Sequence, residues 1–93
     1  MSQIHVDPQA LRDFAGALVR FREAVNEEGN KVDRQLARLG ETWRDQEYDR
    51  FVDEFIVALR AIEAFSADLD VAVPLLLRDA EAIQTYQSYT RPP

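Results

Sequence analysis

The sequence of 93 residues contains no cysteine, one histidine, one tryptophan and three glycines. The absence of cysteine excludes disulfides and thiolate metal sites. Because His5 is the single histidine, neither a catalytic dyad nor a histidine-containing metal site has a second member, and we expect His5 to be solvated. Eleven basic against 17 acidic residues give a net charge of −6, which opposes binding to nucleic acid or to an anionic membrane surface.

Long apolar runs are also missing. No uninterrupted stretch approaches the roughly 20 residues that a membrane span needs. The first seven residues lack the basic region and apolar run of a classical signal peptide. We therefore expect no membrane span and no signal peptide, and either export by a non-classical route or a cytoplasmic location.

The sequence contains no residues in a pattern typical of catalysis. A Gly-rich phosphate loop, a nucleophile elbow and a Ser/His/Asp set are all absent, so the sequence predicts no enzyme and no cofactor. Three carboxylates, Asp45, Asp49 and Asp53, fall four residues apart on one helical face. Most such runs are solvated faces, and we predict no metal site there.

What is present is apolar spacing of three and four residues along nearly the whole chain, which predicts a single all-α domain over residues 1–93. Asp7 followed by Pro8 is a preferred helix start, so the first helix is placed at about 8–39. Its apolar row predicts the seam of a hairpin or bundle. That row consists of Leu11, Phe14, Leu18, Phe21, Val25, Val32, Leu36 and Leu39.

A short turn at 40–45 should join this helix to a second one. Gly40 follows the last apolar position as a helix stop, and Asp45 precedes the next helix as its cap. Short connections join antiparallel neighbours, so the two segments should form an antiparallel hairpin. The second helix is placed at about 46–88, with a kink near Pro74 because proline lacks a backbone donor.

The apolar stripe of the second helix is wider than one facing helix can cover. We therefore expect a dimer interface on this helix. Its predicted members are Phe51, Phe55, Leu59, Ile62, Phe65 and Leu69.

Two long helices in about one hundred residues, with a tryptophan at the turn and aromatics after it, resemble the WXG family, the early-secreted-antigen-type substrates of type VII secretion. Trp43 takes the tryptophan position of the Trp-x-Gly motif, and Asp45 stands where the family has glycine. The aromatics that follow are Tyr48, Phe51 and Phe55. The resemblance covers almost the whole chain.

The resemblance implies a non-enzymatic hairpin that pairs with itself or with a related hairpin into a four-helix bundle. It also implies a role as a secretion substrate or secretion-associated partner, with a larger secreted protein or a secretion ATPase as a further partner. The turn residues Trp43, Arg44 and Asp45 then form an interaction motif. The alternative for Trp43 is that its ring only closes the hairpin core; we favour docking.

The sequence is also compatible with a second function. Exported relatives in actinobacteria tend to carry a tyrosine followed four residues later by an acidic residue. Here Tyr86 is followed at that spacing by Thr90, and Tyr89 by Pro93. Either the chain travels with a partner that carries the signal, or it is a cytosolic adaptor, similar to a chaperone, that binds the helical leader of a larger, toxin-like protein.

Overall fold

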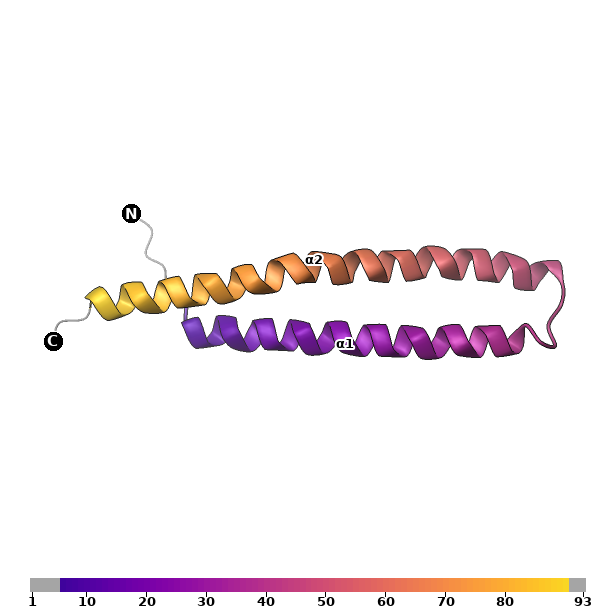
Figure 1. The fold of residues 1–93 in the computed structure, drawn as a ribbon, viewed down its shortest axis with the longest axis horizontal. Helices are drawn as coiled ribbons and strands as arrows, with labels where there is room; N and C mark the ends of the chain where they lie inside the picture. Colours follow the sequence, from indigo (N-terminus) through magenta and orange to yellow (C-terminus); the bar gives the residue numbers. More distant parts are fainter. Residues whose placement is uncertain (1–5, 91–93) are drawn as a thin grey trace.

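The computed structural model describes residues 6–90 and contains two helices. Helix α1 (Pro8–Leu39) and helix α2 (Gln46–Thr90) have 32 and 45 residues, and residues 40–45 connect them. The helices run antiparallel, side by side, in a thin rod of 73 × 23 × 15 Å (Figure 1). No strand occurs in the described part of the chain, and the expected all-α antiparallel hairpin is confirmed.

Local chemistry sets the start of α1. The Asp7 backbone is extended, and its carboxylate accepts a hydrogen bond from the Gln9 N–H at 2.9 Å. This satisfies one of the backbone donors that have no partner in the first helical turn. Pro8 occupies the first turn, where its missing N–H costs nothing, and it is buried.

The core between the helices is narrow. At the end of the hairpin away from the turn it consists of small side chains. There Ala15 and Ala80 are 1% and 0% exposed. Larger side chains fill the rest of the core: Leu36, Leu69 and Val73 are buried. The small side chains at this end allow the two helices to approach closely.

Two aromatic residues expected in the seam lie beside it. Phe14 and Phe21 are each more than half exposed, whereas Ala15, one position after Phe14, is buried. Adjacent helical positions are about 100° apart, so the side chain of Ala15 can face α2 while that of Phe14 points to one side. The apolar row of α1 thus serves two surfaces, the contact with α2 and an exposed side.

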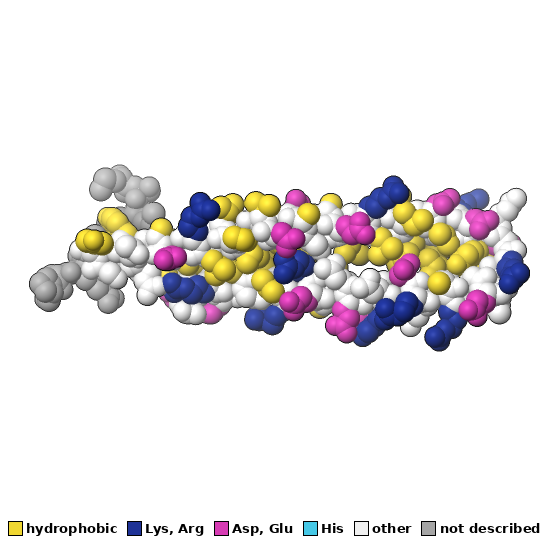
Figure 2. Space-filling model, viewed as in Figure 1, with side chains coloured by type: hydrophobic (Ala, Val, Ile, Leu, Met, Phe, Trp, Pro, Cys, Tyr) yellow, Lys and Arg dark blue, Asp and Glu magenta, His cyan; other side chains and the backbone are white. Residues whose placement is uncertain are grey.

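The two sides of the hairpin differ in chemistry. On one side, which we call the polar side, three side-chain hydrogen bonds cross between the helices. They join Arg12 to Gln84, Arg22 to Asp70, and Asn26 to Ser66, the last at 3.1 Å. Figure 2 shows one broad face of the rod, where hydrophobic side chains gather between the helices towards either end, and charged side chains lie along the edges and near the middle.

Helix α2 continues through Pro74 as one helix. Figure 1 shows a gentle bend along its middle and no break, so the missing donor of Pro74 is accommodated without a new element. The Asp70 carboxylate, one turn before Pro74, bonds Arg22 of α1. Neither helix, over the residues described, is both long and apolar enough to cross a membrane.

Candidate interaction surfaces

The turn at residues 40–45, with the first turn of α2, forms one end of the rod, which we call the tip. Its backbone satisfies the carbonyls that α1 leaves unpaired at its end. The Leu39 carbonyl accepts from the N–H groups of Thr42 and Trp43, at 3.2 and 2.9 Å, and the Leu36 carbonyl accepts from Gly40 N–H at 3.1 Å. The tip is thus a hydrogen-bonded continuation of α1 rather than a loose loop.

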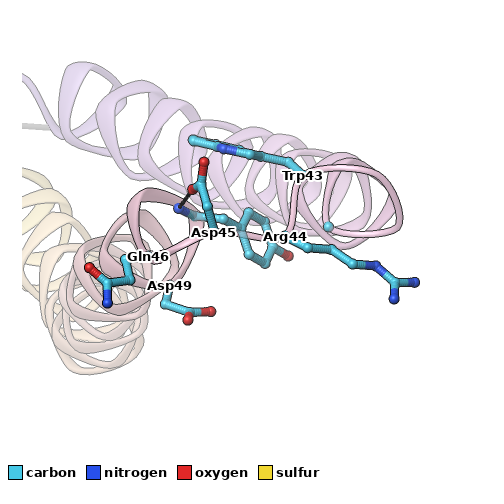
Figure 3. A pocket seen from close by; sticks show the side chains of 7 residues that line it. Trp43, Arg44, Asp45, Gln46 and Asp49 are labelled. Carbon is cyan, nitrogen blue, oxygen red and sulfur yellow. Dashed lines mark hydrogen bonds between the residues drawn. The ribbon is translucent and has the colours of Figure 1, made fainter.

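Asp45 is the N-cap of α2, as its position in the sequence indicated. One carboxylate oxygen accepts the N–H groups of Glu47 and Tyr48 at 2.9 and 3.2 Å, and Figure 3 shows this carboxylate turned toward the start of the helix. Glu47 and Asp49 add negative charge to the first turn, which the positive end of the helix dipole favours.

Trp43 is half-buried and packs against the first turn of α2. Its ring lies edge-on to Tyr48, with centroids 5.5 Å apart and an angle of 63° between the planes. The rest of the ring borders an open hollow of about 450 Å³. Arg44 points away from Trp43 (Figure 3), and its Nε donates to the Glu41 carbonyl at 3.3 Å. Gly40, Trp43, Arg44, Asp45, Gln46, Tyr48 and Asp49 line the hollow.

The second surface, which we call the apolar side, consists of exposed side chains from both helices. Phe21 of α1 is 55% exposed, Phe65 of α2 is 37% exposed, and their rings meet edge to face at 5.8 Å. Val25, Ala61 and Ile62 join these two rings around a shallow hollow of about 310 Å³. The other exposed members, at spacings of seven, eleven or fourteen residues that return to one helical face, are Phe14, Val32, Leu39 and Phe51.

The polar and apolar sides flank the seam from opposite directions. Phe21 and Arg22 are adjacent in sequence, so their side chains are about 100° apart on α1, and on α2 Phe65 and Ser66 are related in the same way. Phe21 contacts Phe65 on the apolar side. On the polar side, Arg22 bonds Asp70 and Ser66 bonds Asn26. Hydrogen bonds therefore join the two helices on the polar side, whereas the apolar side exposes apolar surface.

A family model for WXG100, described as proteins of 100 residues with WXG, matches residues 3–85. The chain belongs to the WXG100 family. WXG100 proteins are small helical proteins associated with type VII secretion, and they are not known enzymes. Neither a curated protein nor a solved structure gives a significant match to the chain.

The residues that the sequence predicted for a WXG100 dimer interface lie at different depths. Phe51 and Phe65 are exposed, Phe55, Leu59 and Ile62 are half-buried, and Leu69 is 6% exposed because it packs within the hairpin. Sequence reasoning assigned the interface to α2 alone, whereas the exposed apolar side also includes Phe14 and Phe21 of α1. The seven-residue spacing of Phe14 and Phe21 is the signal that indicates a second exposed row.

Outside these two surfaces, the described residues of this WXG100 chain give little indication of a metal site. Among residues 6–90 there is no group of three His, Cys, Asp or Glu side chains that could hold a metal ion. Asp45 instead bonds the backbone. His5 lies outside the described residues.

Among the residues that the structure describes, the one shifted pKa belongs to the exposed amine of Lys31. Glu28, which accepts from Lys31 Nζ at 3.3 Å, and Glu27, at 3.6 Å, raise the pKa of Lys31 above its ordinary value. The shift keeps Lys31 charged up to strongly alkaline pH. Because all three groups are exposed, this cluster contributes little to stability.

The cap at Asp45 gives a testable stability difference. Asp45→Ala removes the acceptor of two N–H groups and should lower the free energy of unfolding by about 0.5–2 kcal/mol. Asp45→Gly, which restores the glycine of the WXG motif, should cost only a few tenths of a kcal/mol. Urea unfolding followed by far-UV circular dichroism measures both. Equal losses in the two variants would show that the carboxylate does not contribute as a cap.

Proposed function

We propose that this WXG100 protein acts in type VII secretion as a non-enzymatic dimer, either as a substrate or as a partner of one. In the dimer two hairpins cover each other's apolar side and form a four-helix bundle. The observation that carries the proposal is the set of exposed phenylalanines on one side of a hairpin whose other side is already hydrogen-bonded. A contiguous exposed apolar surface of this kind is typical of an interaction site.

The position of the hollow supports a symmetric arrangement. Phe21 and Val25 lie near the middle of α1, which spans Pro8–Leu39. A two-fold axis perpendicular to the rod at this point places the hollow of one hairpin against that of the other. Four phenylalanine rings, Phe21 and Phe65 from each copy, then meet at the centre of the interface. A related hairpin with a similar central cluster fits the same surface as a heterodimer.

The tip is the second contact surface in this proposal. Dimerisation through the apolar side leaves the tip at the end of the bundle, with Trp43 half-exposed and Arg44 pointing outward (Figure 3). Tryptophan and arginine are the residues most enriched among energetic anchors of interfaces. We assign Trp43, Arg44 and Asp45 to contact with a larger secreted protein or a secretion ATPase.

A cytosolic adaptor is the second candidate function. It is favoured by Thr90 and Pro93 in the positions where an acidic residue would follow Tyr86 and Tyr89. In that role the apolar side would hold the helical leader of a toxin-like protein. The protein would then co-purify with that larger chain and remain inside the cell.

Sedimentation and export together test the proposal. The purified protein should sediment as a dimer at micromolar concentration, alone or mixed with a related hairpin. In its native cell it should reach the medium, and loss of the type VII ATPase should retain it. Trp43→Ala should keep the dimer and lose export. A monodisperse monomer that no related hairpin converts to a dimer would contradict the bundle, and export independent of the ATPase would contradict the secretion role.

A further inference from the structure

Gly40 lies at the junction of α1 and the tip. Glycine is required there because of the neighbouring Tyr48 side chain and not because of the backbone conformation. Its φ of −64° and ψ of −15° lie in the right-handed helical region, where any residue fits. A Cβ at this position would lie 2.6 Å from Tyr48 Cζ and 3.0 Å from Tyr48 Cε1, and closer still to the Tyr48 hydroxyl. Glycine is present because the Tyr48 ring crosses the space that a side chain would fill.

Three contacts hold the Tyr48 ring in that place. Its hydroxyl donates to the Leu36 carbonyl at 3.0 Å, its ring packs against the Trp43 ring, and its backbone N–H donates to the Asp45 carboxylate. The ring cannot move aside for a Cβ without losing the first two. Tyr48 therefore links the end of α1, the tryptophan of the tip and the cap of α2.

We propose that Gly40 and Tyr48 are positioning residues that fix the Trp43 ring in its half-exposed orientation. We call the pair the tip latch. The chain has Asp45 where the WXG motif has glycine, and its latch glycine lies three residues before the tryptophan instead. Fixing the ring before a partner arrives reduces the entropy cost of binding. This last consequence rests on the proposed role of the tip, whereas the latch itself does not.

The other two glycines differ from Gly40 in their surroundings. A Cβ at Gly29 would make an ordinary contact of 3.8 Å with Leu59 Cδ2, and one at Gly16 would meet only the flexible end of Arg20, at 3.3 Å. Alanine is the better helix former, so substitution at Gly29 should raise stability. Gly29→Ala is therefore the matched control for the same substitution at Gly40.

A double-mutant cycle on the full chain tests the latch, with all variants compared at one concentration. In the wild-type background Gly40→Ala should lower the thermal midpoint by roughly 4–8 °C, the shift that a modest loss of stability produces in a domain of this size. It should also shift the emission of Trp43, the only tryptophan, to longer wavelength as the ring gains water. In a Tyr48→Ala background, Gly40→Ala should neither lower the thermal midpoint further nor shift the Trp43 emission further.

The controls separate the latch from a general effect on helix α1. Gly29→Ala should raise the midpoint and leave the Trp43 emission unchanged. Tyr48→Ala alone should shift the emission as Gly40→Ala does, which keeps the test decisive if the Gly40 variant does not fold. Equal midpoint losses in both backgrounds, or unchanged Trp43 emission in Tyr48→Ala, would overturn the proposal. The Trp43 emission and the comparison between backgrounds at one concentration require neither a partner protein nor export, so the proposed function stands or falls separately.

Discussion

Phe21→Glu should convert the proposed dimer into monomers at micromolar concentration. Phe21 contacts Phe65 at the hollow of the apolar side, where the proposed two-fold axis brings both copies together. The substitution removes an aromatic anchor and places a charge in each half of the interface. A loss of at least about 2 kcal/mol corresponds to a dimer roughly 30-fold weaker. Sedimentation velocity over a concentration series measures the change in dissociation constant.

Val71→Glu is the matched control for this substitution. Val71 is 65% exposed, so it accepts a charge without cost to folding. It lies six residues after Phe65, which places it about a third of a turn away from the apolar side. The Val71 variant should sediment as the wild type does. A dimer that survives Phe21→Glu, or one that Val71→Glu disrupts, would show that the hairpins pair through another surface.

Ala80→Leu should clearly destabilise the hairpin. Ala80 and Ala15 are fully buried and lie between the cross-links Arg12–Gln84 and Arg22–Asp70, which hold the helices at close distance. Added methylene groups have no space there, so the helices must separate or the side chain must adopt a strained rotamer. Overpacking of this kind costs typically about 1–3 kcal/mol.

An exposed alanine on the same helix provides the comparison. Ala67→Leu adds the same volume at an exposed position and should change the free energy of unfolding by no more than about 0.5 kcal/mol. Chemical denaturation of both variants at one protein concentration measures the difference. If Ala80→Leu matched Ala67→Leu, the alanine contact would not limit how closely the helices approach.

The sequence predicted the hairpin because its signals are local. Asp7 with Pro8 marks a helix start, and Gly40 and Asp45 bracket the turn, each through chemistry that involves only a few neighbouring residues. Helical periodicity then gives two apolar rows. These signals are sufficient for the element order and for the antiparallel direction.

The sequence did not predict which apolar row faces which surface. Phe14 and Ala15 are neighbours, and the choice of Ala15 for the seam depends on how closely the helices approach, which is a property of the whole hairpin. The role of Gly40 was missed for a related reason. Its contact with Tyr48 forms only after the chain turns, and its backbone angles do not distinguish it from other helical residues.

The thickness of the rod has a consequence for the life of the protein in a cell. At 15 Å the hairpin is only slightly thicker than a single helix with its side chains, about 10–12 Å, so it has almost no interior of its own. When the apolar side is covered by association, stability rises with protomer concentration. In the proposed dimer, a protomer made in excess of its partner would therefore be less stable and more open to proteolysis.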